Sequence, residues 1–197
     1  MTQISSHAPG MPCWIDTGVA TSEIRNKLMN FYSTLFGWKF EVGGPETGWY
    51  SIAFLNNKPV LGIGEQSDGE GRWITYFSSS DIEAAAKRVR DAGGEIVMGP
   101  YKVLDLGIMA HAIDVTGARH GLWQPITFPG FGVIDAPNTV GWFDHVSEDQ
   151  AKAAHYYQAV LSNGIVLHAE GDMLVLMKDE HWFASVSQGD ASETAPQ

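Results

Sequence analysis

The sequence predicts an α+β protein built from three repeated units, each a strand, a helix and then several short strands. Tryptophan-led apolar runs begin the units at Trp14, Trp73 and Trp142. Each run is followed by a segment with helical spacing, and then by residues that alternate with a period near two. Apolar residues make up 44% of the 197 residues, so we expect a packed core and exclude a largely disordered chain.

The three helical segments are predicted from their apolar spacing. The first is expected to bury Ile24, Leu28, Phe31 and Leu35. The second is expected to bury Ile82, Ala85, Ala86 and Val89, after a capping box of Ser80 and Glu83. The third has an apolar stripe of Ala153, Tyr157, Val160 and Leu161, after a similar box of Ser147 and Gln150. Hairpin turns are predicted at 56–59 and 114–117.

The charge balance excludes several classes of partner. Twelve basic and 23 acidic residues give a net charge of −11, which disfavours nucleic acid and anionic membranes. No apolar run approaches the roughly 20 residues that span a bilayer, and the first dozen residues do not resemble a secretion signal. Cys13 is the single cysteine, so neither an internal disulfide nor a cysteine metal cage is expected. We therefore predict a cytoplasmic protein.

Several segments together carry a resemblance to a known family. They are Pro12-Cys-Trp-Ile-Asp16, 31–38 (FYSTLFGW), 73–77 (WITYF), 92–94 (AGG), Met109-Ala110, 114–117 (DVTG) and 121–124 (GLWQ). In combination they resemble the glyoxalase / bleomycin resistance protein / extradiol dioxygenase superfamily, which has the vicinal oxygen chelate fold. The resemblance implies βαβββ modules, paired so that their strands curl around a concave pocket.

The resemblance also implies a division of the chain into domains. We expect an N-terminal arm (1–11), a two-module domain (12–125), a linker (126–137), a third, unpaired module (138–187) and a tail (188–197). A lone module is expected to need a partner surface. Our hypothesis is a homodimer in which the third module completes its sheet against its twin. The alternative is that this module packs on its own first domain.

Metal-dependent members of this superfamily hold a divalent ion with His or Glu on the first and last strands of each module. The resemblance places those positions at Trp14, Gly62 or Ile63, Ile74 or Thr75, and Gly121. None of them is a good ligand. His111 and His120 flank a predicted hairpin and are the remaining candidates for a metal pair, but a strand histidine is more often a structural residue. We predict no metal and no cofactor.

Two residues are candidates for moving a proton, Asp16 and His111. Asp16 shares a strand face with Trp14, and an aromatic pocket disfavours a charged carboxylate and so favours a general base. The structural alternative is that Asp16 binds backbone amides or a lysine, and its counterpart Asp144 in the third unit supports that view. His111 interrupts an apolar strand, where it either contacts a ligand or is hydrogen-bonded in the fold.

Aromatic residues on predicted strands suggest a pocket for a flat, conjugated molecule, although some of them will be core. The predicted ligand-binding residues are Trp14, Tyr50, Tyr76, Met109, Arg119 and Trp123. We predict a metal-independent protein that binds an aromatic or polyketide-like small molecule in antibiotic biosynthesis or resistance. If it is an enzyme, it is a cofactor-free isomerase, cyclase or lyase. The alternatives are a metal-dependent lyase or dioxygenase of the same superfamily and a non-catalytic accessory protein.

Overall fold

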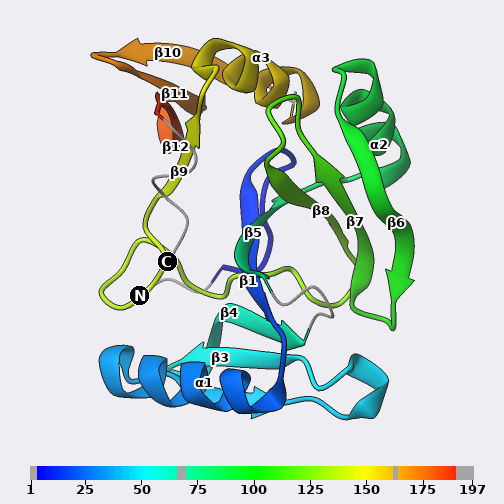
Figure 1. Cartoon of the computed structure of the whole chain (residues 1–197), viewed down its shortest axis with the longest axis vertical. Coiled ribbons are helices and arrows are strands. Elements are labelled where there is room, and N and C mark those ends of the chain that lie inside the picture. The colour runs from blue at the N-terminus through cyan, green and yellow to red at the C-terminus, as the bar shows by residue number, and fades with distance from the viewer. Residues whose placement is uncertain (1–3, 66–69, 162–163, 190–197) are drawn as a thin grey trace. The chain divides into compact units, whose positions relative to one another are not determined.

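A computed structural model describes residues 4–65, 70–161 and 164–189. They form twelve strands and three helices, arranged along the chain as three βαβββ modules (Figure 1), which confirms the predicted α+β class and the repeat. Residues 1–3 of the predicted arm and 190–197 of the predicted tail lie outside the described residues. Among the helices that the structure describes, none is long and apolar enough to cross a membrane.

Each module has the same order of elements. The first contains β1 (Pro12–Val19), α1 (Ser22–Phe36), β2 (Lys39–Val42), a 3-10 turn (Pro45–Thr47), β3 (Ser51–Leu55) and β4 (Lys58–Glu65). The second contains β5 (Glu70–Ser78), α2 (Ile82–Asp91), β6 (Glu95–Val103), β7 (Gly107–Ile113) and β8 (Arg119–Pro125). The third contains β9 (Phe143–Ser147), α3 (Gln150–Leu161), β10 (Val166–Glu170), β11 (Met173–Lys178) and β12 (His181–Gln188).

The chain folds into two compact units, which are described separately. The first comprises Met1–His7, Cys13–Tyr76 and Pro129–Gly141. The second comprises Ala8–Pro12, Phe77–Phe128 and Trp142–Gln197. Apart from β5, most of which lies in the first unit, the second module therefore shares a unit with the third, whereas the sequence had suggested that it pairs with the first.

The sheet of the first unit has the strand order β2-β3-β4-β1-β5. Strand β1 runs parallel to β4, with Asp16 opposite Gly62, and β3 pairs antiparallel with β4 through a hairpin turn at the predicted position. Asn56 and Asn57 both have positive φ there, a conformation that asparagine tolerates. Helix α1 packs on this sheet over a core that includes Trp38, Leu61 and Ile63.

Helix α1 does not bury the side that its spacing predicts. Ile24, Phe31 and Leu35 are 43%, 56% and 55% exposed. The helix is instead packed through Arg25, Leu28, Met29, Tyr32 and Phe36. Arg25 is tolerated inside because its guanidinium donates to the Glu65 carboxylate at 2.6 Å. Because an arginine interrupts the apolar residues of the inner face, the apolar spacing predicted that the opposite face is buried, and this prediction was wrong.

The second unit contains the strands β8-β7-β6 and a four-stranded sheet in the order β10-β11-β12-β9. Helices α2 and α3 contribute to one core, which holds Val89 from α2 and Tyr157 and Val160 from α3. The predicted buried face of α2 is confirmed. Its cap is Asp81 rather than the expected Ser80, because the Asp81 side chain accepts from the Ala84 amide. The third module thus packs against the second within this unit.

The segment predicted as a linker is partly built into the first unit. Phe131 is fully buried, and its amide donates to the Cys13 carbonyl at 2.8 Å. Val133 joins the core beneath α1, and the Trp38 indole donates to the Asn138 carbonyl. Residues 129–141 therefore complete the first unit.

Candidate functional site

The first candidate site is a hydrogen-bonded group around Asp16 in the first unit. Its carboxylate oxygen Oδ2 accepts from the Tyr50 hydroxyl at 2.9 Å and from the Tyr76 hydroxyl at 3.0 Å. The Trp14 indole donates to the Tyr50 hydroxyl at 2.8 Å. Phe131 packs on Trp14, with their ring centroids 5.4 Å apart. The structure thus brings together four of the predicted site residues, Trp14, Asp16, Tyr50 and Tyr76.

The strand geometry explains how this group assembles. Side chains alternate along β1, and Ile15 and Val19 belong to the core beneath α1, so Asp16 lies on the other face. Gly62 lies opposite Asp16 on β4. A Cβ at Gly62 would lie 1.8 Å from the Tyr50 hydroxyl oxygen, so only glycine leaves room for this tyrosine beside Asp16.

The environment of Asp16 changes its acidity. The residue is only 6% exposed, and burial raises the pKa of its carboxyl to about 7, although the hydrogen bonds from Tyr50 and Tyr76 act to lower it. Oxygen Oδ1 is also buried and has no hydrogen-bond partner within the described part of the chain. Burial and the nearby Asp16 raise the pKa of Tyr50 well above its usual value. Asp16 can therefore accept or release a proton near neutral pH.

The third module repeats the Trp-x-Asp sequence in a different environment. The Trp142 indole donates to Asp144 Oδ1 at 2.8 Å, and the Ser185 hydroxyl donates to the same oxygen. Asp144 is exposed to solvent, and so is Trp142. The repeat therefore does not assign Asp16 a purely structural role, because only the Asp16 carboxyl is buried.

We expect Gly62→Ala to force the Tyr50 hydroxyl away from Asp16. Overpacking at this contact should lower the free energy of unfolding by about 2 kcal/mol, measured by urea denaturation. Gly64→Ala is the matched control, because a Cβ there would approach the same ring only to 3.3 Å. Equal losses for the two variants would contradict the proposed fit between Tyr50 and Gly62.

A second group of predicted residues lies on the β7–β8 hairpin of the second unit. Met109 is opposite Trp123, and His111 is opposite Gly121. The alternate residues Ala110, Ala112 and Leu122 face the helical core, so Met109, His111, Arg119 and Trp123 share the other face. Burial, and then the charge of Arg119, lower the pKa of His111 to about 4. His111 is therefore neutral at pH 7.

The residues present do not fit the divalent metal site of metal-dependent relatives. The space that a side chain at position 62 would fill is taken by the Tyr50 hydroxyl. His111 and His120 point to opposite faces of their hairpin, because His111 pairs with Gly121 while His120 pairs with Ala112. Across residues 4–65, 70–161 and 164–189, no three His, Cys, Asp or Glu side chains converge as a metal site requires.

A buried polar cluster in the second unit was not predicted from the sequence. His120 shares a hydrogen bond with the Tyr156 hydroxyl at 2.8 Å. The Asp114 carboxylate lies 3.5 Å from the His145 imidazole. Burial, and then the charge of Asp114, raise the pKa of Tyr157 well above its usual value. Burial lowers the pKa of His120 to about 4 and also lowers that of His145. The cluster combines one turn, one helix and two strands, so no local pattern marks it.

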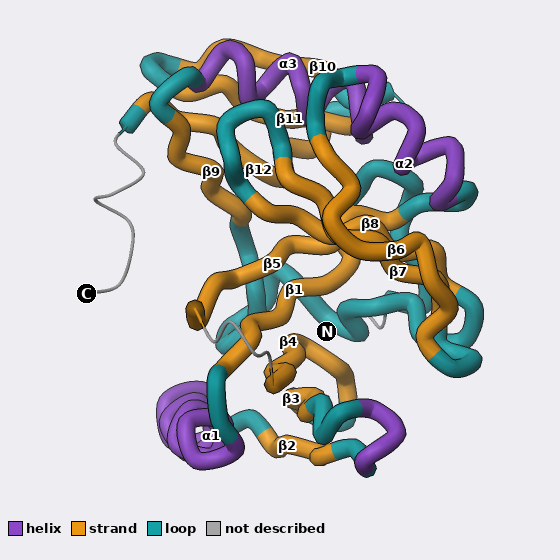
Figure 2. The backbone as a smooth tube through the Cα atoms, turned by 45° about the vertical axis from the view of Figure 1, so that its right-hand side comes forward, coloured by secondary structure: helices purple, strands orange, loops and turns teal. Residues whose placement is uncertain are grey.

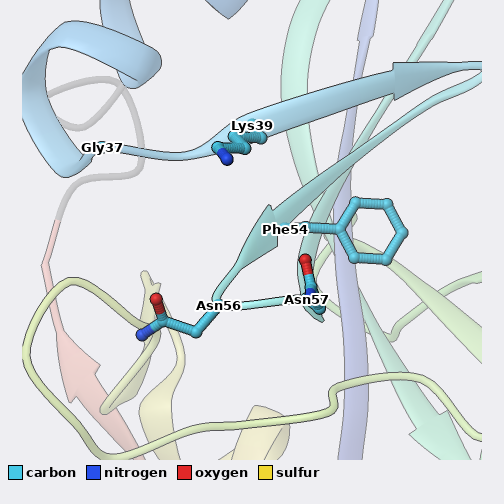
Figure 3. Close-up of a pocket in the computed structure, with 5 residues that line it drawn as sticks. All are labelled: Gly37, Lys39, Phe54, Asn56 and Asn57. Carbon is cyan, nitrogen blue, oxygen red and sulfur yellow. The ribbon is translucent and has the colours of Figure 1, made fainter.

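An open hollow of about 360 Å³ lies elsewhere in the first unit (Figure 3). It is lined by Gly37, Lys39, Phe54, Asn56 and Asn57. None of these belongs to the predicted site, and one cation with two amides offers little to an apolar ligand. The hollow is therefore not the predicted aromatic cleft.

Comparison with known families identifies the fold. Residues 25–119 match the model of the Glyoxalase/Bleomycin resistance protein/Dioxygenase superfamily. The matched segment belongs to this superfamily. It is 34% identical over 174 residues to the anthracycline biosynthesis protein DauV of Streptomyces sp. (strain C5), and equally to DnrV of Streptomyces peucetius. Each match covers 78% of this chain and 61% of the relative, so the chain spans about three fifths of the length of these relatives.

Solved structures support the same fold at low sequence identity. A 2,2′,3-trihydroxybiphenyl 1,2-dioxygenase from Sphingomonas wittichii matches with a TM-score of 0.67 and 16% identity, over 92% of this chain and 68% of that chain. The Mn(II)-bound glyoxalase from Novosphingobium aromaticivorans matches with a TM-score of 0.68 and 13% identity, over 92% and 62%. At these identities the likeness extends to the superfamily fold alone.

Proposed function

We propose that this chain is a cytoplasmic, metal-independent protein that binds a flat aromatic or polyketide-like small molecule in antibiotic biosynthesis or resistance. The observation that carries the proposal is the buried Asp16 carboxyl, whose Oδ1 lacks a partner among the described residues. A phenolic hydroxyl would donate to this oxygen when Asp16 is ionised, and a quinone carbonyl would accept from it when Asp16 is protonated. The similarity to two anthracycline biosynthesis proteins supports the same ligand class.

Catalysis would require only a proton transfer. With a pKa near 7, Asp16 could remove a proton from a bound hydroxyl or activated carbon and return it to another position of the same ligand. That chemistry fits an isomerase, a cyclase or a lyase without a cofactor. Tyr50 and Tyr76 would stabilise the ionised carboxylate through Oδ2 during the step. We also propose that the protein acts as a homodimer.

Titration with a hydroxylated anthraquinone, followed by tryptophan fluorescence, tests the proposal. We expect Asp16→Ala to weaken binding about tenfold, which corresponds to the loss of one hydrogen bond to a charged group. Asp144→Ala is the matched control and should bind as wild type. At pH 8, where Asp16 is mostly ionised and cannot donate, unsubstituted anthraquinone should bind more weakly and respond to neither change.

Equal binding of the hydroxylated and unsubstituted probes by the wild-type protein would overturn this proposal. Arg119→Ala in the same titration tests the predicted contacts on the β7–β8 hairpin separately. Mass spectrometry of the recovered ligand distinguishes binding from catalysis. If the ligand is converted, Asp16→Asn should abolish turnover while changing affinity far less.

A further inference from the structure

Helix α1 carries a second apolar face that the first unit does not cover. Its outer stripe consists of Ile24, Leu28, Phe31 and Leu35. Three of these are 43–56% exposed, and Leu28, which is partly buried, borders the packed side. Figure 2 looks nearly along α1, with β2, β3 and β4 of the same unit to one side of it. An apolar stripe this long on a monomer surface usually marks an interaction site.

The spacing of the outer stripe indicates what covers it. Its residues are separated by four, three and four positions, the seam of a two-stranded coiled coil. This spacing is symmetric about the midpoint between Met29 and Asn30. In an antiparallel pair related by a twofold axis, Ile24 would face the partner's Leu35, and Leu28 would face the partner's Phe31. Every residue of the stripe therefore meets another apolar residue of the stripe.

If two copies pair through the stripe, the local charges favour the antiparallel orientation. The stripe has no charged residue on a chain whose net charge is −11. Glu23 lies in the first turn of α1, and no basic residue lies in its last turn. An antiparallel pair keeps the two Glu23 side chains at opposite ends of the seam and sets the two helix dipoles in opposite directions, whereas a parallel pair would bring both Glu23 side chains together. Glu23 and Lys27 already form an ion pair 2.8 Å apart at the edge of the stripe.

We propose that the outer stripe of α1 is the interface of a homodimer in which two α1 helices pack antiparallel. The half-exposed Trp73, whose ring lies 6.3 Å from Tyr32, extends the apolar surface at one edge. The interface is small, so the dimer is weak and depends on concentration. Added salt strengthens it, because salt screens the repulsion between two acidic chains. This inference supplies the surface for the proposed homodimer and does not depend on the ligand.

Sedimentation of the full chain over a dilution series tests the interface. We expect a monomer–dimer equilibrium, and Phe31→Glu should raise the dimer dissociation constant at least tenfold. Ser33→Glu, on an exposed position of α1 outside the stripe, should leave it nearly unchanged. Circular dichroism verifies that both variants are folded, and Leu35→Glu provides a second disruption. A monomer at every concentration, or a dimer indifferent to Phe31→Glu, would show that the proposal is wrong.

Cysteine cross-linking tests the antiparallel orientation. Ile24→Cys and Leu35→Cys, mixed and oxidised, should form a disulfide between two chains, while either variant alone should not. The native Cys13 is fully buried and contributes no background. A cross-link formed by Ile24→Cys alone would indicate parallel helices and refute the proposed pairing. Ligand binding by the Phe31→Glu monomer should match wild type, so failure of the dimer proposal and of the ligand proposal can be told apart.

Discussion

Asp16→Asn will gain stability relative to the wild-type protein as the pH rises. Burial raises the pKa of Asp16 in the folded chain to about 7, from an ordinary value of 3.8. The folded state therefore binds this proton more tightly than the unfolded state. The stability that the protonated carboxyl contributes to the folded chain is lost as the pH rises from 3.8 to about 7. Asparagine does not titrate, so the difference in unfolding free energy should move in its favour by about 3 kcal/mol from pH 4.5 to pH 8.

Urea denaturation at a series of pH values measures this difference. Taking the difference from wild type cancels every other titrating group. Asp144→Asn is the control, because that aspartate is exposed in an otherwise similar Trp-x-Asp sequence. A flat difference for Asp16→Asn would show that Asp16 keeps an ordinary pKa and would remove its role as a proton carrier at neutral pH.

His120→Gln will show the opposite dependence. Burial lowers the pKa of His120 to about 4, so the folded chain holds this imidazole neutral. The unfolded chain takes up the proton near pH 6.5, and the wild-type protein therefore loses stability as pH falls from 6.5 towards 4. Glutamine keeps a partner for the Tyr156 hydroxyl but cannot be protonated. As the pH falls from 7 to 4.5, the unfolding free energy of the variant should rise by about 2.5 kcal/mol relative to that of the wild-type protein.

The same denaturation series, with His155→Gln as the control, measures this effect. His155 is also on the second unit, but its side chain is exposed. We expect no pH-dependent difference for the control. If His120→Gln and His155→Gln have parallel profiles, the loss of stability in acid originates from other groups.

Sequence periodicity predicted the modules well but failed where a polar residue was buried. The face of α2 was predicted correctly because its inner residues are all apolar. The face of α1 was not, because Arg25 lies inside and forms its ion pair with Glu65, 40 residues away. The apolar spacing of a helix depends only on the residues of that helix. It therefore predicts the wrong buried face when a charged residue is buried against a partner that is distant in the sequence.

The candidate site was predictable as residues but not as an arrangement. Trp14, Asp16, Tyr50 and Tyr76 were selected because they are aromatic or ionisable residues on predicted strands. That both tyrosines donate to a single carboxylate oxygen depends on two neighbours of β1: Tyr50 is accommodated at the empty position of Gly62 on β4, and Tyr76 comes from β5 on the other side. Neither fact can be obtained from one strand alone, because both arise from contacts across the sheet.

The way residues 129–141 complete the first unit has a consequence for synthesis of the protein. Phe131 and Val133 emerge from the ribosome only after the whole second module has been made. The first module must therefore wait, with part of its core unfilled, while later segments are translated. We expect nascent chains arrested before this stretch to be far more sensitive to protease in their amino-terminal portion than chains arrested after it. The earliest part of this chain to be translated is thus among the last to become fully protected.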